Sequence, residues 1–370
     1  MTPLAQHIAG LIAGRGPIGI DDYMALCLGH PEHGYYRTRD PLGRRGDFIT
    51  APEISQMFGE LIGLWCADYW LRSGRPASVT LVELGPGRGT LMADAHRAAG
   101  AIPGFLDAVS IHLVETSPVL RAAQAATLND VPAPTWHDEL ASLPDSGPLL
   151  VIANEFFDAL PIRQFIRTDR GWCARRVGLT PEAGTPRFMP VVDPDPSLDP
   201  ETPGNPAPNT PIGSIIENSP ASETITRDLA RRISHQGGAA LIIDYGHTQS
   251  TSGDTLQAVR AHQYADPFDA PGEADLTAHV DFAALARAAQ EQGARVHGPV
   301  TQGQFLHTLG IEARAARLKA RATTPQDREI DLALHRLTAP DQMGRLFKAL
   351  ALSTPGGPTP AGFPESCAPT

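Results

Sequence analysis

The sequence has few of the residues and segments that indicate disulfide, zinc or membrane chemistry. Its four cysteines, Cys27, Cys66, Cys173 and Cys367, are widely scattered and form no Cys-x-x-Cys pair. This spacing indicates neither a zinc site nor a disulfide framework, and it favours a reducing compartment. No apolar run is long enough to span a membrane, and the first 16 residues lack the features of a signal peptide. We therefore expect a protein of the bacterial cytoplasm, without a membrane span or a metal site.

An excess of basic residues is also absent. The chain has 30 Lys and Arg against 41 Asp and Glu, which gives a net charge of −11. This balance argues against a general nucleic-acid-binding protein, so we expect no nucleic-acid partner. With 370 residues, 42% of them hydrophobic, the chain can bury a sizeable core.

Alternating apolar strands and helical stretches after Pro76 predict an α/β fold. Strand-like runs recur at Val79–Leu84, Ser110–Val114, Leu149–Ala153 and Ala239–Ile243. Alanine-rich helical stretches separate several of them, which implies a parallel sheet covered on both faces. The segment from Arg163 to Val177 is predicted to form extra strands inserted into this core.

The N-terminal region differs from the rest, with helices and turns but no convincing strand series. The apolar spacing from Ile54 to Leu71 predicts its clearest helix. We expect a helical cap over residues 1–75 and a core over residues 76–354, with insertions around 160–215 and 250–278. A proline-rich acidic loop at 190–211 and a frayed tail at 355–370 complete the organisation.

A glycine-rich turn follows the first predicted core strand. The sequence runs through Glu83 into Gly85-Pro86-Gly87-Arg88-Gly89, before a helix-like stretch from Thr90 to Ala99. Glycines here let the backbone approach a ligand closely. The G-x-G-x-G spacing fits neither a dinucleotide fingerprint nor a phosphate-binding P-loop. It therefore favours a ligand without pyrophosphate, such as S-adenosylmethionine, with Glu83, Gly85, Gly87 and Gly89 as candidate cofactor residues.

Two further acidic residues lie where such a cofactor would bind. Glu115 ends the next strand, where a carboxylate can accept hydrogen bonds from both ribose hydroxyls. Asp138, after Trp136-His137, is placed to contact the adenine amino group. An ordinary tight turn with solvated acidic residues is the simpler alternative.

The segment Asn154-Glu155-Phe156-Phe157-Asp158 follows another buried strand. Asn154, Glu155 and Asp158 are expected at the carboxyl edge of the sheet, where open α/β folds bind ligands. A guanidinium is charged at neutral pH and a poor nucleophile, and a carboxylate pair can hold it bidentately. These three residues are therefore the candidate catalytic and acceptor-binding residues.

Two further segments, one before the predicted Ile54 helix and one at the end of the Ala239–Ile243 strand, contain polar residues without a clear assignment. Thr50 and Glu53 match a helix capping box, which leaves Asp47 to face the cofactor. Tyr245 or His247 could line a substrate pocket, although a satisfied histidine at a strand end is an equal alternative.

The sequence resembles the MidA-like S-adenosylmethionine-dependent methyltransferases over most of its length, from about Gly16 to Leu352. The resemblance rests on several phrases: GDFITAPEISQMFGELIG, LVELGPGRGTLMAD, VETSPVLR, NEFFDALPIRQF, ENSP, LIIDYGH, PGEADLTAHVDF and TQGQFLHTLGI. It implies a Rossmann-like class I methyltransferase sheet with a helical N-terminal cap and inserted strands and loops.

The resemblance also implies roles for individual residues. It places Asp47, Pro52 and Glu53 near the cofactor and Asn154, Glu155 and Asp158 on the acceptor side. The mitochondrial branch of the family methylates arginine and assists assembly of respiratory complex I, which suggests a subunit of a respiratory NADH dehydrogenase as partner. Arginine methyltransferases elsewhere have a glutamate pair in an analogous loop, whereas the second acid here is aspartate.

Three alternatives to protein arginine methylation are consistent with parts of the pattern. The acceptor could be another amine, since an acidic pocket attracts any cation. The protein could be an assembly chaperone that binds S-adenosylmethionine without catalysis. A nicotinamide oxidoreductase is disfavoured by the glycine spacing.

Overall fold

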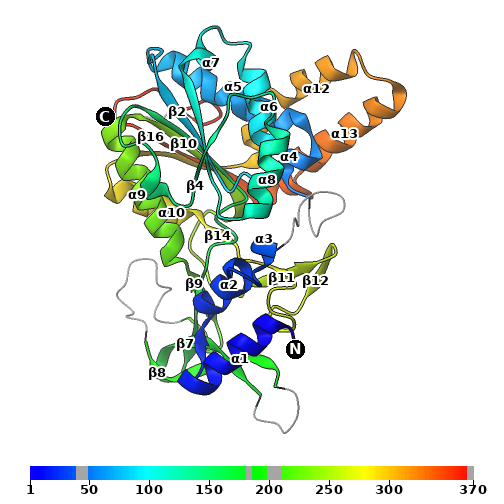
Figure 1. Ribbon diagram of the computed structural model, residues 1–370. Helices are drawn as coiled ribbons and strands as arrows, with labels where there is room; N and C mark the ends of the chain where they lie inside the picture. Colours follow the sequence, from blue (N-terminus) through cyan, green and yellow to red (C-terminus); the bar gives the residue numbers. More distant parts are fainter. Residues whose placement is uncertain (39–48, 181–185, 198–209, 365–370) are drawn as a thin grey trace. The chain divides into compact units, whose positions relative to one another are not determined.

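The computed structural model describes residues 1–38, 49–180, 186–197 and 210–364 (Figure 1). The chain divides into two compact units. The first contains Met1–Phe48, Phe157–Thr224 and His247–Leu285, and the second contains Ile49–Phe156, Ile225–Gly246 and Ala286–Thr370. Our prediction placed residues 1–75 in one N-terminal domain, whereas residues 49–75 group with the second unit.

The first unit combines short helices with antiparallel strands. Its helices are α1 (Pro3–Arg15), α2 (Ile20–Gly29) and α3 (Tyr35–Thr38). One sheet has the order β1-β7-β6-β9, with β8 also pairing with β7. Its strands are β1 (Ile18–Gly19), β6 (Arg163–Thr168), β7 (Gly171–Leu179), β8 (Phe188–Pro196) and β9 (Ile215–Asn218). The extra strands predicted between Arg163 and Val177 are thus confirmed.

A smaller sheet in the same unit has the order β12-β11-β13. Its strands are β11 (Gln257–Arg260), β12 (Gln263–Ala265) and β13 (Asp275–Thr277), and the two-residue strand β14 (Val280–Asp281) follows. These strands fall largely within the insertion that we predicted around residues 250–278.

The second unit is built on a mixed sheet with a parallel centre. Its strands follow the order β15-β16-β10-β5-β2-β3-β4. The parallel strands are β2 (Val79–Leu84), β3 (Val109–Val114), β4 (Thr135–His137), β5 (Leu149–Asn154) and β10 (Gly238–His247). Strand β16 (Phe347–Ser353) is antiparallel to both β10 and β15 (Arg295–Thr301). The predicted α/β fold with a parallel sheet is therefore confirmed.

Helices connect these strands and pack on the sheet. They are α4 (Ala51–Ile54), α5 (Gln56–Arg72), α6 (Thr90–Ala99), α7 (Phe105–Ala108), α8 (Pro118–Thr127), α11 (Gln302–Thr308), α12 (Ile311–Lys319), α13 (Thr324–Thr338), α14 (Met343–Leu346) and a single 3-10 turn at Leu140–Ser142. Figure 1 shows α12 and α13 as a helical hairpin. Helices α9 (Pro220–Gln236) and α10 (Phe282–Glu291) each begin in the first unit and end in the second. In the described part of the chain, no helix is both long and apolar enough to cross a membrane.

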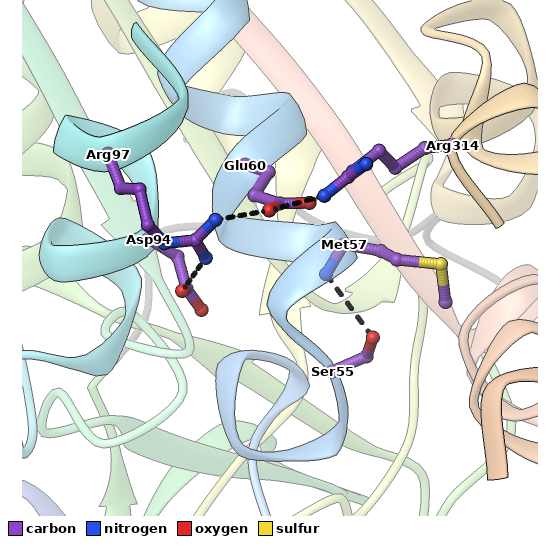
Figure 2. Close-up of polar contacts among 6 residues, drawn as sticks. All are labelled: Ser55, Met57, Glu60, Asp94, Arg97 and Arg314. Atoms are coloured by element: carbon purple, nitrogen blue, oxygen red, sulfur yellow. Dashed lines mark hydrogen bonds and ion pairs between the residues drawn. The ribbon is translucent and has the colours of Figure 1, made fainter. Parts of the chain in front are cut away.

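The helix predicted from Ile54 to Leu71 is present, but it is interrupted near its start. Ser55 is extended, with φ −162° and ψ 139°, and it separates α4 from α5. Its hydroxyl accepts a hydrogen bond of 3.2 Å from the Met57 N–H (Figure 2). Ser55 thus acts as the N-cap of α5, because a serine hydroxyl can satisfy an N–H group that has no partner in the first helical turn.

Helix α5 packs very closely on α6, and two glycines make this possible. A Cβ atom at Gly63 would lie 2.2 Å from the carbonyl oxygen of Ala95, and one at Gly59 would lie 2.8 Å from the Cβ of Asp94. Both distances are shorter than van der Waals contact. The small residues therefore determine how near α5 lies to α6 and, through it, to the glycine turn that precedes α6.

A buried carboxylate joins α5 to two other helices. The side chain of Glu60 is 2% exposed and accepts hydrogen bonds from Arg97 at 2.6 Å and from Arg314 at 2.6 and 2.8 Å (Figure 2). Burial alone would raise the pKa of Glu60, but the hydrogen bonds from Arg314 and Arg97 outweigh it and hold the pKa below its usual range. Arg97 also pairs with Asp94. The ionised Glu60 thus fixes α5 between α6 and α12.

We predict opposite effects for alanine at two helical glycines. Gly63→Ala should lower the free energy of unfolding by more than about 2 kcal/mol, because the new methyl group collides with backbone that cannot rotate away. Gly10 lies in the interior of α1, where a Cβ atom would have nothing within 4 Å, so it is the matched control. Gly10→Ala should raise stability by about 0.5–1 kcal/mol, because alanine loses less backbone entropy on folding. Urea unfolding measures both changes, and equal effects would contradict the close packing of α5 on α6.

Candidate active site

The carboxyl ends of the parallel strands in the second unit carry most of the predicted site residues. Because β2, β3, β4, β5 and β10 run in the same direction, the loops that follow them emerge at one edge of the sheet. At this edge lie Gly85, Gly87 and Gly89 after β2, Glu115 after β3, Asp138 after β4, and Asn154 and Glu155 at the end of β5. The structure thus brings these seven residues to the same region, as the sequence predicted.

The glycine turn adopts a backbone that requires glycine. Gly85, Gly87 and Gly89 have φ values of 60°, 54° and 83°, in the left-handed region that side chains disfavour. A Cβ atom at Gly85 would also lie 2.9 Å from Cδ2 of Phe156. The turn is held by hydrogen bonds from the Gly85 N–H to the Val114 oxygen at 3.0 Å and from the Gly89 N–H to the Pro86 oxygen at 2.7 Å. It leads directly into the N-terminus of α6, so its main chain is open to a closely bound ligand.

Glu115 is buried and tied to the glycine turn by a glutamine. One carboxylate oxygen accepts the Ser117 N–H at 2.7 Å, and the other accepts Nε2 of Gln124 at 3.2 Å. The same Nε2 donates to the Gly87 carbonyl at 2.8 Å. Burial raises the pKa of Glu115, although the hydrogen bonds from Ser117 and Gln124 lower it in part. Gln124 therefore joins Glu115 to the glycine turn, a link that the sequence did not predict because a glutamine within α8 has no local signal.

Arg121 links Asp138 to Glu115. Arg121 donates from Nε to the Glu115 carbonyl oxygen at 2.7 Å and from Nη2 to Asp138 at 2.8 Å. The Asp138 side chain remains 81% exposed, so it is accessible to a ligand. Its predicted contact with adenine stays a prediction.

Helix α4 connects the glycine turn to the end of β5. The capping box predicted for Thr50 and Glu53 is wrong, because the Thr50 side chain makes no capping hydrogen bond. Glu53 instead accepts a hydrogen bond of 2.6 Å from the hydroxyl of Thr90, the first residue of α6. Pro52 lies within α4, and Asp47 lies outside the described residues. Glu53 is thus held next to the glycine turn, although sequence spacing suggested a purely local partner.

Asn154 and Glu155 form a connected pair at the end of β5. Asn154 is buried and donates from Nδ2 to Glu155 Oε1 at 3.2 Å, and the Ala51 N–H donates to the same oxygen at 2.8 Å. The buried Oδ1 of Asn154 has no hydrogen-bond partner within the described residues. It is therefore a buried acceptor that the described residues leave unpaired. Glu155 has a φ of 50°, which costs a residue with a side chain on the order of 1 kcal/mol.

The third predicted acceptor residue, Asp158, belongs to the first unit. It is buried, and its carbonyl oxygen accepts the Ala278 N–H at 3.0 Å. Burial raises the pKa of Tyr36 well above its usual value, and the carboxylates of Asp275 and Asp158 add to this effect. Tyr36 donates a hydrogen bond of 2.8 Å to Asp275. Asp158 thus lies close to Tyr36, which is itself bonded to Asp275; the sequence predicted no role for either of these two residues.

Glu83 faces the interior of the second unit. It is 3% exposed, and its buried Oε2 has no hydrogen-bond partner among the described residues. Burial raises its pKa to about 8. Burial also raises the pKa of the Cys66 thiol on α5, and the nearby Glu83 carboxylate contributes. The surroundings of Glu83 are therefore those of a core residue, and its proposed contact with a cofactor stays a prediction.

Tyr245 and His247, which the sequence left without a role, lie near the end of β10. The ring of Tyr245 packs edge-to-face on Phe347, with centroids 5.4 Å apart. His247 belongs to the first unit, where its Nε2 is 4.0 Å from Asp281. No group of three or more metal-ligating side chains with suitable geometry occurs in the described ranges.

The residues at this edge fit S-adenosylmethionine on three structural grounds. Gly85, Gly87 and Gly89 carry no side chains that would keep a ligand from their main chain, the Glu115 carboxylate can accept from hydroxyl donors, and the buried Asn154 Oδ1 is an acceptor without a partner in the described contacts. Glu115 and Asn154 provide hydrogen-bond acceptors, and the glycine turn provides main chain without side chains. Such groups suit a ligand with hydroxyl, amino and cationic groups, because those groups donate hydrogen bonds or carry positive charge.

Comparison with known proteins agrees with this chemistry. A family model of S-adenosyl-L-methionine-dependent methyltransferases matches residues 61–300. Protein arginine methyltransferase NDUFAF7, mitochondrial, of Mus musculus is 39% identical over 379 residues, which cover 95% of this chain and 84% of the relative. The NDUFAF7 homolog of Drosophila melanogaster is 39% identical over 378 residues, with 94% and 84% covered.

A solved structure agrees as well. A protein from Burkholderia thailandensis bound to S-adenosyl-homocysteine superposes with a TM-score of 0.83 at 29% identity, covering 97% of this chain and 93% of that chain. The class I methyltransferase fold and S-adenosylmethionine as methyl donor are thereby confirmed. The chain belongs to the family of S-adenosylmethionine-dependent methyltransferases that includes these relatives.

Proposed function

We propose that this methyltransferase transfers its methyl group to an arginine side chain of a protein. The observation that carries the proposal is the pair Asn154 and Glu155, in which an amide with an unpaired, buried oxygen is hydrogen-bonded to a carboxylate at the carboxyl edge of the sheet. The arginine methyltransferases that are 39% identical to the chain support the choice of acceptor.

The chemistry defines what the protein groups must do. S-adenosylmethionine supplies an electrophilic methyl group on a sulfonium, so a C–S bond breaks as a C–N bond forms and a neutral thioether leaves. The attacking guanidinium nitrogen also loses one proton, which passes to the Glu155 carboxylate or to solvent water. Because the guanidinium is charged and delocalised, it must be aligned and its positive charge drawn away from the attacking nitrogen.

Glu155 and Asn154 can supply both functions. The Glu155 carboxylate attracts the guanidinium and stabilises positive charge during transfer. Asn154 Oδ1 can accept an N–H of the same group and orient it. Asp158 remains a candidate second carboxylate, by its predicted place in the acceptor loop.

The cofactor side uses different groups. The backbone of Gly85, Gly87 and Gly89 would lie against the bound donor, and Glu115 would accept hydrogen bonds from its ribose. Asp138 would contact the adenine amino group. Glu53, Pro52, Glu83 and Asp47 are the further residues that we assign to this side on the basis of the sequence.

We predict that Glu115→Ala weakens cofactor binding without unfolding the protein. Loss of charge-assisted hydrogen bonds to the ribose should lower the affinity for S-adenosylmethionine by about 30-fold. Calorimetric titration measures this change, with NADH as a ligand that should not bind. Glu139→Gln is the matched control, because Glu139 is an exposed acid close in the sequence. Equal affinity in wild type and Glu115→Ala would remove Glu115 from the cofactor site.

Glu155→Gln should separate binding from transfer. Glutamine keeps an oxygen that can accept the Ala51 N–H but lacks the charge that holds the guanidinium. We expect transfer to an arginine-containing substrate to fall by about 100-fold or more, while affinity for S-adenosylmethionine stays within about twofold. Radiolabelled methyl transfer and calorimetry give the two quantities. If both fall equally, Glu155 belongs to the cofactor side.

The protein substrate that we propose is a subunit of a respiratory NADH dehydrogenase, by resemblance to the mitochondrial branch of the family. Mass spectrometry of that subunit, from cells with and without the gene, should show arginine methylation only when the gene is present. Unmodified arginines in both samples would exclude this substrate. Methylation of a different amine by the purified protein would retain the methyltransferase and replace arginine as the acceptor.

A further inference from the structure

Glu155 has a backbone conformation that glycine adopts more easily. Its φ of 50° lies in the left-handed region, where the side chain crowds the main chain. A non-glycine residue persists in this conformation only when the surrounding structure holds it there. The groups that hold Glu155 are therefore of interest for the function of its carboxylate.

The end of β10 holds both peptide groups that follow Asn154. The Glu155 N–H donates to the Ile243 carbonyl oxygen at 2.9 Å, just beyond the last pair of the β5–β10 ladder. The Phe156 N–H donates to Oδ2 of Asp244 at 3.2 Å. Beyond the last main-chain acceptor, the Ile243 carbonyl, the Asp244 carboxylate accepts the next N–H group, because β5 turns away from β10 at Glu155.

Asp244 is itself fixed in position. Its side chain is completely buried, and Oδ1 accepts the Tyr245 N–H at 2.9 Å. Both carboxylate oxygens of Asp244 thus accept main-chain N–H groups, one in the segment that follows β5 and one within β10. Asp244 can therefore determine the conformation of the turn that it binds.

The turn affects both sides of the site. The Glu155 carboxylate accepts the Ala51 N–H of α4, while the Phe156 ring lies so close to Gly85 that a Cβ atom there would be 2.9 Å from Cδ2. A change in the direction of the Phe156 N–H would therefore move a carboxylate and a ring together.

We propose that Asp244 is a positioning residue for methyl transfer, which holds the Glu155–Phe156 turn so that Glu155 can bind the acceptor. This inference rests on the proposed role of Glu155. Asp244 acts through Glu155, so removing both should cost no more activity than removing Glu155 alone.

The first test is a double-mutant cycle on methyl transfer with wild type, Asp244→Asn, Glu155→Gln and the double variant. Asparagine would turn an NH₂ group toward one of the two N–H donors, which should release the turn. We expect kcat of Asp244→Asn to fall by about 100-fold, since small displacements of an aligned group have effects of this size. The kcat of the double variant should match that of Glu155→Gln. Multiplicative losses in the double variant would overturn the proposal.

His297→Asn is the control for simple loss of stability. His297 is also a buried, hydrogen-bonded polar residue of the second unit, paired with the Ser353 hydroxyl at 2.8 Å, and it has no place in the proposed site. Its substitution should lower the urea midpoint but leave kcat unchanged in both the wild-type and Glu155→Gln backgrounds. A fall in kcat equal to that of Asp244→Asn would overturn the specific positioning role of Asp244.

A second test does not depend on catalysis. Glycine adopts a left-handed backbone without the strain that a side chain causes. Glu155→Gly should therefore have a higher urea midpoint than Glu155→Ala while Asp244 is present. In the Asp244→Asn background this preference for glycine should disappear. If glycine is preferred equally in both backgrounds, Asp244 does not hold the turn. If wild type transfers no methyl group to arginine while the glycine preference behaves as expected, the proposed function fails but the structural role of Asp244 stands.

Discussion

The parallel hydrogen-bond ladder of β2, β3, β4, β5 and β10 is the constraint on which the site depends. Parallel strands place all their carboxyl ends at one edge, so loops far apart in the sequence meet there. The glycine turn, Glu115 and the Asn154–Glu155 pair are close together only for this reason. Packing of α5 on α6 then sets where α4 lies, because α5 follows α4 directly and its glycines allow no further separation.

Four buried carboxylates of the second unit show how environment gives one chemical group different properties. Glu60 stays ionised between two arginines, whereas burial raises the pKa of Glu83, which has no cationic partner in the described contacts. Glu115 accepts hydrogen bonds that connect it to the glycine turn. Asp244 accepts two main-chain N–H groups and acts as an extension of the sheet. Among these four, only Glu115 follows a parallel strand and is also hydrogen-bonded to a residue that contacts the glycine turn.

The proposed cofactor residues and the proposed acceptor residues Asn154 and Glu155 are joined by short contacts within the second unit. Helix α4 is held by two hydrogen bonds, one from the Ala51 N–H to Glu155 and one from the Thr90 hydroxyl to Glu53. Thr90 is the first residue of α6, the helix that follows the glycine turn. The Phe156 ring adds a second connection by packing on Gly85. A methyl transfer requires donor and acceptor to be aligned, and these contacts can hold the glycine turn and the Asn154–Phe156 segment in a fixed relative position.

The sequence by itself determined many of the strands and helices and the position of the glycine turn. Strand β2 and helix α6 were predicted with their observed ends, and glycine spacing identified the turn, because periodicity and backbone preferences act over a few residues. The partners of the polar side chains were decided by tertiary structure. Glu53 bonds Thr90 instead of capping its own helix, and Gln124 and Asp244 became important only through contacts with distant segments. A polar side chain bonds whichever partners the fold brings within hydrogen-bond distance, and a local sequence pattern does not determine which distant segments these are.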